Sequence, residues 1–344
     1  MFRFFFLLSL LSNIQSLTAS EPRELVIYAN DSFNAQGGIG PVILPLFEKK
    51  CGCRVRVLSS GNSVQLLNRL AVDAKRKKPT AHLVVGLDQN LWEQIQDYVE
   101  SWGSWVPSGY RDLDRSFTIG KNFLPYDYGI LAFIADRQLM KEMKLRDLPV
   151  TLSDLLKPEW KRNILIEDPR TSTPGLMMLL YSQNIYDTEV WKFWKQFKSQ
   201  WLTMTPGWSA AYRLFLKKEA PLVWSYVSSQ AYHEENGDTG PHPRYQAVLF
   251  KEGQPYQVEG AAWIKGAAQT SEEKRWVREF LEFLLSPEVQ ALIPKTLWMM
   301  PVRKGTPLPP SFKKLPQPTR LIPVSMKTQE IRDTLSQWNQ AIGF

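Results

Sequence analysis

Short apolar stretches alternate with amphipathic segments along the N-terminal part of the chain. Runs rich in Val, Ile and Leu, which are typical of strands, lie at residues 23–28, 54–58 and 82–87. Helices are predicted at residues 41–50, 62–77 and 90–101. Strands that alternate with helices predict βαβ units and a mostly parallel sheet flanked by helices.

The same alternation restarts in the second part of the chain. Residues 128–135 form an apolar strand that is long enough to cross between two lobes. Further strands are predicted at residues 163–166, 222–226 and 256–265. Further helices are predicted at residues 176–181, 188–203, 272–285 and 328–340, the third of them capped by Ser271. Two α/β units joined by long strands predict a bilobed clamp, with the ligand between the lobes at the carboxyl ends of strands.

The first twenty residues have the layout of a cleaved secretory signal. Arg3 supplies a positive charge, residues 4–11 are apolar, and small or polar residues follow up to Ser20. This apolar segment is too short to span a bilayer, and no later segment approaches about 20 apolar residues. No Cys lies near the cleavage site, which excludes a bacterial lipoprotein anchor. We therefore expect residues 1–20 to be a signal peptide and the mature chain to be secreted and soluble.

Composition narrows the class of protein. The chain has 344 residues, of which 44% are apolar, so it can bury the core of one large domain or two ordinary ones. A net charge of +8 also occurs in nucleic-acid-binding proteins. However, no RRM, KH, zinc-finger or helix-turn-helix signature accompanies this charge, and we favour a generally basic surface without a nucleic-acid partner.

Only two cysteines are present, Cys51 and Cys53. In an oxidising compartment they can form a tight local disulfide. A metal or catalytic role is less favoured because no His lies nearby and a metal site needs more ligands.

One turn in the second half of the chain combines several hydroxyl groups with a helix start. Pro174 suits the first helical position, which makes Thr173 the expected N-cap, and Ser172 lies beside it. Such a turn can hold a hydroxyl, phosphate or carboxylate of a ligand. An ordinary capped helix start explains the same residues equally well.

Aromatic residues are abundant, with 13 Trp and 12 Tyr. Most of them belong in a core, but Trp208, Tyr226 and Trp298 lie in turns or at strand ends. There an aromatic ring can stack on a flat ligand or lie against a cation.

Strand-end acids are the second requirement for a cationic ligand, because a buried cation needs a partner. Asp31 follows the first strand, Asp88 follows the third, and Asp127 lies near the crossing between lobes. The competing interpretation is an Asx turn or a helix cap for each of them. The three histidines are scattered and no hydrolase, metalloprotease, Walker or Rossmann motif is present, so we expect no enzyme and no resident cofactor or metal.

These residues belong to an ordered set of motifs that covers nearly the whole mature chain. The motifs lie at residues 31–33, 51–53, 66–70, 84–88, 125–129, 168–176, 207–209, 214–217, 225–226, 231–233, 257–259 and 298–299. The set resembles the periplasmic thiamine-binding proteins of bacterial ABC importers. Its most specific part is Asp168-Pro169-Arg170-Thr171-Ser172-Thr173-Pro174-Gly175.

The resemblance implies a two-lobed periplasmic-binding-protein fold of type II with thiamine, or its mono- or diphosphate, between the lobes. It also implies a monomer that works with a membrane permease and an ATPase. Lobe 1 is expected to comprise residues 21–128 and about 257–296, and lobe 2 residues 129–256 and about 297–344. The implied ligand contacts, together with Asp31, are Asn62, Ser63, Ser172, Thr173, Trp208, Tyr226, Val227, Ser228, Ser229, Gln230, Tyr232 and Trp298.

Three positions depart from the family's pattern. Asn62 replaces an acid, the loop around Gly37 lacks an aromatic residue, and Asn30 replaces a common Tyr. Losing a carboxylate beside a cation removes a contact worth roughly 1.5–3 kcal/mol. Another cation, such as a polyamine or ferric ion, is therefore an alternative ligand. A thiamine-degrading enzyme is the remaining alternative, although its cysteine nucleophile has no evident counterpart here.

Overall fold

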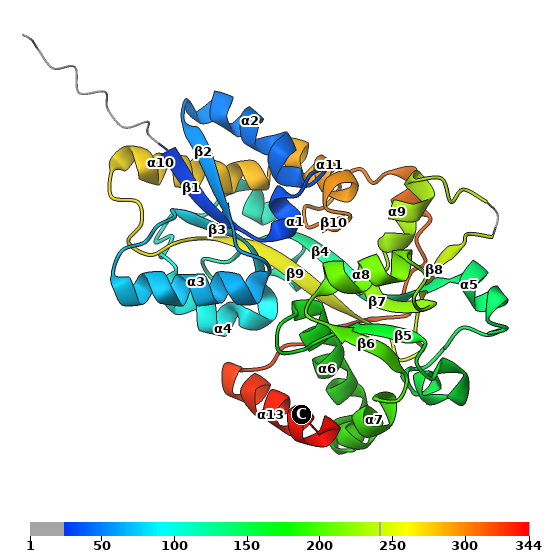
Figure 1. The fold of residues 1–344 in the computed structure, drawn as a ribbon. Helices are drawn as coiled ribbons and strands as arrows, with labels where there is room; N and C mark the ends of the chain where they lie inside the picture. The colour runs from blue at the N-terminus through cyan, green and yellow to red at the C-terminus, as the bar shows by residue number, and fades with distance from the viewer. Residues whose placement is uncertain (1–23, 241, 344) are drawn as a thin grey trace, which may run out of the picture.

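Two long strands, β4 (Leu124–Asp136) and β9 (Gln254–Trp263), run from one lobe of the molecule into the other (Figure 1). The computed structural model describes residues 24–240 and 242–343, and the expected signal peptide lies outside them. The two strands pair antiparallel from Leu124 to Ile130 of β4, and the rest of β4 pairs with β7 and β8. The predicted two-lobed α/β fold is confirmed, and the predicted crossing strand is β4. None of the helices within the described residues is both long and apolar enough to span a membrane.

The strands follow the order β2-β1-β3-β9-β4-β7-β5-β6, with β8 and β10 also paired to β4 and β11 paired to β9. β1 pairs in parallel with β2 and β3, and β5 pairs in parallel with β6 and β7. The parallel strands of each lobe therefore flank the two crossing strands. The remaining bounds are β1 (Glu24–Ala29), β2 (Arg54–Ser59), β3 (Leu83–Asp88), β5 (Ile164–Glu167), β6 (Trp201–Thr205), β7 (Leu222–Tyr226), β8 (Tyr245–Val248), β10 (Met300–Pro301) and β11 (Leu321–Ile322).

Lobe 1 is built on β1, β2 and β3, whose side chains pack on helices from both ends of the chain. Figure 1 shows α2, α10 and α11 over one face of these strands and α3 and α4 over the other. These helices are α2 (Ile39–Cys51), α3 (Ser63–Arg76), α4 (Trp92–Ile95), α10 (Ser271–Leu284) and α11 (Pro287–Thr296). The core of this lobe includes Phe47, which contacts the rings of Phe280 and Phe283.

Lobe 2 has a core on each face of its sheet. Along β4, Leu131 and Phe133 pack into one core while Ala132 and Ile134 pack into the other. This alternation follows from the period of two in a strand whose faces are both covered. The flanking helices are α6 (Thr173–Tyr186), α7 (Val190–Phe197) and α13 (Thr328–Ile342) on the first core, and α8 (Trp208–Leu216), α9 (Ser229–Glu235) and α12 (Pro310–Lys313) on the second.

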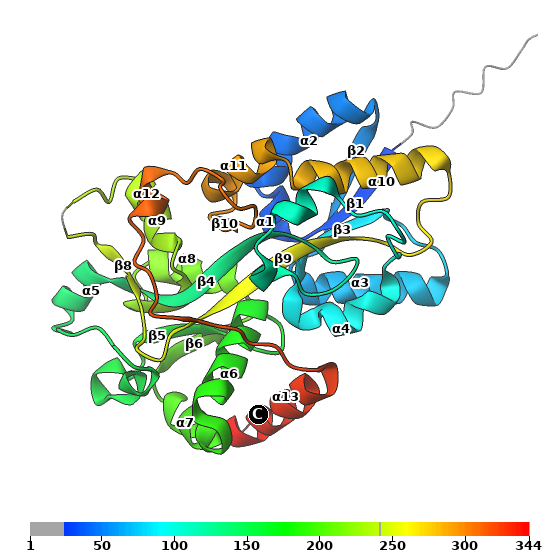
Figure 2. The same cartoon turned by 180° about the vertical axis from the view of Figure 1, so that it is seen from behind.

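The chain returns to lobe 2 after α11. Met299 and Val302 still pack in the core of lobe 1, whereas Trp298 and Met300 pack against the second core of lobe 2. Figure 2 shows the following segment passing α12 and running along lobe 2 to α13. The remaining short elements are α1 (Asp31–Asn34), α5 (Arg137–Glu142) and 3-10 turns at residues 89–91, 96–98, 108–112, 115–117, 152–156, 158–160 and 187–189.

Two predicted helices are wrong in part. The segment 188–203 contains α7, but it ends in β6, because the helical apolar spacing stops at Phe197 and the next residues pair with β5. The segment 90–101 breaks into short turns, since Val99 forms a β-bridge with Ile264 and leaves the helical path. Tertiary pairing overrides local helical propensity in both segments. A smaller difference is that Thr270, rather than Ser271, caps α10.

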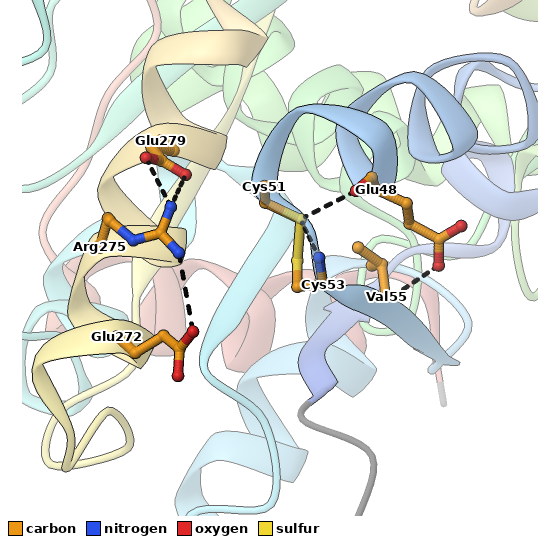
Figure 3. Close-up of a disulfide and its surroundings, with 7 residues drawn as sticks. All are labelled: Glu48, Cys51, Cys53, Val55, Glu272, Arg275 and Glu279. Carbon is orange, nitrogen blue, oxygen red and sulfur yellow. Dashed lines mark hydrogen bonds and ion pairs between the residues drawn. A yellow bond between two sulfur atoms is a disulfide. The ribbon is translucent and has the colours of Figure 1, made fainter.

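The two cysteines form a disulfide at the C-terminus of α2 (Figure 3). Gly52 between them has φ = 65°, the left-handed conformation that glycine adopts without strain. Glu48 of the same helix accepts a hydrogen bond from the backbone of Val55 at the start of β2. The disulfide thus fixes the entry into β2, at the opposite end of the strand from Ser59.

Candidate ligand-binding site

Three carboxylates form a row across neighbouring strands. Glu259 in β9 is the register partner of Asp88 in β3 on one side and of Asp127 in β4 on the other. Side chains at paired positions lie on the same face of a sheet, with Cβ atoms about 4.5–5.5 Å apart. The crossing strands therefore carry three acids close together.

Hydrogen bonds fix two members of this row. Glu259 accepts from Asn30 Nδ2 (3.2 Å) at one oxygen and from the hydroxyl of Tyr126 (3.3 Å) at the other. Asp88 accepts from Gln257 Nε2 at 2.5 Å. Both carboxylates thus keep a defined orientation through neutral donors.

Two further carboxylates have no hydrogen-bond partner within the described part of the chain. Both oxygens of Asp127 and both oxygens of Glu167, at the end of β5, are buried and unpaired. None of the ion pairs that join described residues involves either of them, nor Asp88 or Glu259. In residues 24–240 and 242–343, no group of three or more His, Cys, Asp or Glu is arranged to hold a metal ion. A buried carboxylate in this position either holds a proton or faces a cationic ligand.

Burial governs the protonation of these acids. It raises the pKa of Glu259 to about 7, with a further contribution from the charge of Asp88. Burial also raises the pKa of Asp88 to about 6, against the hydrogen bonds that it accepts. The pKa of Asp127, which is raised by burial and then by the charge of Glu259, lies well above its usual range. Burial likewise raises the pKa of Glu167 well above its usual range.

Tyr226 lies among the four carboxylates. Burial, followed by the charges of Glu259, Asp88, Glu167 and Asp127 in that order, raises the pKa of its hydroxyl well above the usual value. That hydroxyl donates to the side-chain oxygen of Gln257 at 2.6 Å. An aromatic ring and a set of acids therefore occupy one site.

Gly129 in β4 makes room for this ring. A Cβ atom at Gly129 would lie 2.5 Å from Cδ1 of Tyr226 and 2.7 Å from the side chain of Met299. Gly129 is two residues from Asp127 and hence on the same face of the strand. The missing side chain lets Tyr226 approach the crossing strands.

Trp208, the first residue of α8, is the second ring of the site. Its centroid lies 6.3 Å from that of Tyr226, and the ring of Tyr212 stacks on it at 4.9 Å. The indole Nε1 donates to Ser225 Oγ (2.8 Å), which lies 2.9 Å from Ser229 Oγ. Trp208 is thus held in one orientation by Ser225, which in turn contacts Ser229.

Tyr232 and Trp298 form a separate aromatic pair with centroids 5.0 Å apart at 86°. Ser228 Oγ donates to the carbonyl oxygen of Trp298 at 2.5 Å. Trp298 has φ = 56°, which is uncommon for a residue other than glycine. Trp298, one of the predicted ligand contacts, thus combines a left-handed backbone with a hydrogen bond to its carbonyl oxygen.

Asn62 joins the two lobes. As the N-cap of α3 it accepts from Val64 N at 2.9 Å, while its Nδ2 donates to the carbonyl oxygen of Thr171 at 2.7 Å. Asp31 is exposed and accepts from the backbone of Gly61, next to Asn62. Ser63 is buried, and its hydroxyl donates to the carbonyl oxygen of Gly86 at 2.5 Å.

The cap of α6 differs from the prediction. Ser172, not Thr173, is the N-cap, and its hydroxyl accepts from Gly175 N at 3.3 Å. Pro174 therefore occupies the second helical position. The hydroxyl of Thr173 accepts from Gln257 Nε2 at 3.2 Å, which connects this turn to the carboxylate row.

Two of the predicted contact residues serve the packing of lobe 2. Val227 is buried in its second core. Gln230 accepts from Ala247 N at 2.9 Å and so ties α9 to β8. Neither side chain reaches the carboxylate row in these contacts.

Sequence reasoning did not select Glu167 or Glu259 as site residues. The signal for Glu259 was available, because Gln257 and Glu259 alternate with apolar residues in a strand that otherwise reads as buried. The signal for Glu167 was weaker, since an acid directly after an apolar strand is usually a cap.

Comparisons with known proteins agree on one class. Residues 80–324 match the family model described as "Bacterial extracellular solute-binding protein". A curated relative from Brucella abortus, a "Thiamine-binding periplasmic protein", is 38% identical over 92% of this chain and 91% of its own length. The protein of the same name from Escherichia coli is 37% identical over 92% of this chain and 93% of its own length.

Solved structures give the same picture. A "Periplasmic thiamin binding protein" superimposes with a TM-score of 0.80 and 34% identity, covering 93% of this chain and 96% of the other. The periplasmic binding protein AfuA from Actinobacillus pleuropneumoniae, with fructose-6-phosphate bound, superimposes with a TM-score of 0.78. At 19% identity, that second likeness concerns the fold alone.

Proposed function

Because the chain belongs to the family of bacterial extracellular solute-binding proteins, we propose that it captures a small molecule for an ABC importer. The proposed ligand is thiamine, thiamine monophosphate or thiamine diphosphate, in keeping with the names of its relatives. The mature protein acts in the periplasm as a soluble monomer. It delivers the ligand to a membrane permease driven by an ATPase.

The observation that carries this proposal is that acidic side chains and aromatic rings lie close together on and beside the strands that cross between the lobes. Tyr226 lies beside buried carboxylates that form no ion pair within the described residues, and the ring of Trp208 lies 6.3 Å from that of Tyr226. Thiamine combines a fixed positive charge on its thiazolium ring with a flat aminopyrimidine. The charge suits acids and the faces of Trp and Tyr, and the flat ring suits stacking.

The two aromatic pairs and the cap of α6 offer places for the parts of such a ligand. In this proposal Trp208 and Tyr226 receive the charged ring, and Tyr232 and Trp298 complete an aromatic wall. The turn at Ser172 receives the hydroxyethyl tail. The wider set of proposed contacts is Asp31, Asn62, Ser63, Ser172, Thr173, Trp208, Tyr226, Val227, Ser228, Ser229, Gln230, Tyr232 and Trp298.

A binding role is proposed in preference to an enzyme that cleaves thiamine. Such a reaction needs an activated nucleophile. Both cysteines of the chain are paired with each other, at the end of β2 that lies away from Ser59. Incubating the pure protein with thiamine and following intact vitamin tests this point, and steady loss of thiamine would contradict it.

The test of the proposal is a titration of ligand-free protein. The mature chain is unfolded, refolded and titrated with thiamine and each phosphate while tryptophan fluorescence is followed. Quenching that saturates at micromolar or lower ligand, about −8 kcal/mol or better, is expected. The order of the three affinities shows which form is the ligand.

The polyamine and ferric-ion alternatives are included in the same screen. Binding of spermidine or Fe³⁺ without a response to any thiamine compound would contradict the proposed ligand.

A further inference from the structure

The carboxylate row has a buried part and an accessible part. Asp88 and Asp127 have no exposed surface. Glu259, which lies between them in the register, is only partly buried. Glu259 is therefore the member of the row that a bound molecule can reach.

The setting of Glu259 leaves its charge uncompensated by the protein. Its two donors, Asn30 and Tyr126, are neutral, so they orient the carboxylate without cancelling its charge. Its two register neighbours are acids, and one of them, Asp127, is fully buried with both oxygens unpaired. Negative potential in a site of low dielectric is concentrated at such a point.

An aromatic ring lies on the same side of the sheet. Gln257 is two residues from Glu259 on β9 and accepts from the hydroxyl of Tyr226. A cation at Glu259 therefore also lies within reach of an aromatic ring, an arrangement that strengthens cation binding when water is excluded.

We propose that Glu259 is the residue that recognises the positive charge of an organic cation, and that Asp88 and Asp127 reinforce it from the two neighbouring strands. This inference rests on the proposed function, because it assigns the charge-recognising residue of that same site. Asp31, the exposed acid near Asn62, has a screened charge and is not that residue.

The test compares a cation with a neutral molecule of the same shape. Wild type, Glu259→Gln and Asp127→Asn are titrated with thiamine, with its neutral thiophene isostere deazathiamine, and with spermidine as a different organic cation. Glu219→Gln, which removes an exposed carboxylate on lobe 2, is the matched control.

Glu259→Gln is expected to weaken thiamine binding at least tenfold, about 1.4 kcal/mol, while the affinity for the neutral isostere changes less than threefold. Asp127→Asn is expected to act in the same direction with a smaller factor, and Glu219→Gln to leave both affinities unchanged. Equal losses for thiamine and the isostere, or no loss for either, would overturn the assignment because Glu259 would then not sense charge.

The remaining outcomes separate this inference from the proposed function. If wild type binds spermidine but not thiamine, and Glu259→Gln removes that binding, the role of Glu259 is supported and thiamine is contradicted as the ligand. If wild type binds none of the cations, both the role of Glu259 and the proposed ligand are contradicted. Glutamine keeps the shape of Glu259 and can still accept from Asn30, and should this variant not fold, Asp127→Asn decides by the same comparison.

Discussion

The side-chain amide of Asn62, at the start of α3 in lobe 1, donates a hydrogen bond of 2.7 Å to the carbonyl oxygen of Thr171 in lobe 2. This bond joins the lobes outside the two strands that connect them. The resemblance predicts an acid at this position, and an ionised acid could not donate this bond to a carbonyl. Asn62 thus favours contact between the lobes by itself, without a ligand in between.

Replacing Asn62 by Ser tests this role. Serine caps a helix about as well as asparagine, so the stability of α3 should change little. The shorter side chain loses the bond to Thr171, which is worth about 0.5–1.5 kcal/mol. Stopped-flow measurement should therefore show thiamine leaving the variant several-fold faster. Equal dissociation rates, with equal melting temperatures, would show that the bond does not hold the lobes together.

The raised pKa values predict how the affinity depends on pH. Glu259, with a pKa of about 7, and Asp88, with a pKa of about 6, are ionised above these values, and a cation binds the ionised form. Affinity for thiamine should thus be highest above about pH 7 and fall as the pH drops toward about 5. The neutral groups that face Glu259, Asn30 and Tyr126, do not titrate in this range. Burial and the charge of Glu259 raise the pKa of Asp127 well above its usual range, so the charge of Asp127 also grows as the pH rises.

Calorimetric titration at several pH values measures this dependence. Glu259→Gln should flatten the part of the curve near pH 7. An affinity for thiamine that is constant over the whole range would contradict the assignment of charge to this site.

The same pKa shifts predict an opposite trend for the ligand-free protein. The folded state binds more protons than the unfolded chain, because burial raises the pKa of Glu259 and Asp88. Stability is then fully present below the unfolded values of about 4 and is lost as the pH rises through about 6 and 7. Thermal melts of ligand-free protein should show this loss, on the order of 3 kcal/mol for each group, and Glu259→Gln should reduce it. If the melting temperature instead rose between about pH 4 and pH 7, and Glu259→Gln removed that rise, the prediction would be contradicted.

Gly129→Ala probes the space beneath Tyr226. The new Cβ would lie 2.5 Å from the ring of Tyr226, so the ring must shift, at a cost of about 1–3 kcal/mol. Thiamine affinity should fall together with stability. Gly240→Ala is the control, because nothing lies within 4 Å of a Cβ there, and it should change neither quantity. An unchanged affinity in Gly129→Ala would remove Tyr226 from the binding site.

Removal of the disulfide should affect stability but not binding. The bond between Cys51 and Cys53 closes a very short loop, so replacing both residues by Ala should cost on the order of 1–2 kcal/mol in unfolding free energy. It lies at the start of β2, six residues and about 20 Å from the end at Ser59. Denaturant unfolding of the double variant measures the loss of stability, and a thiamine titration shows whether its affinity is unchanged. A large loss of affinity would tie the disulfide to the ligand.

Much of the fold could be predicted because its local signals agree with its tertiary contacts. The apolar spacing after Asn62 gives α3, and the uninterrupted run from Tyr128 to Ala135 gives the crossing strand. The prediction fails over residues 201–205, where pairing with β5 decides the structure and no local pattern separates strand from helix. Similarly, Val99 leaves the helical path because of its distant partner Ile264.

The site was predictable in its residue types but not in its arrangement. Asp88 and Asp127 were recognisable as candidate partners for a cation, since each lies near a strand end. That Glu259 stands between them follows from the antiparallel register of β9 with β3 and β4, which a single sequence does not contain. The roles of Val227 and Gln230 in packing likewise depend on the position of β8 and the core of lobe 2.

The most direct test of the account is isothermal titration calorimetry of thiamine into the refolded mature protein. We expect one site per chain with a Kd of about 1 μM or lower, about −8 kcal/mol, at neutral pH. No heat of binding up to millimolar thiamine or its phosphates, from protein shown to be folded, would contradict it.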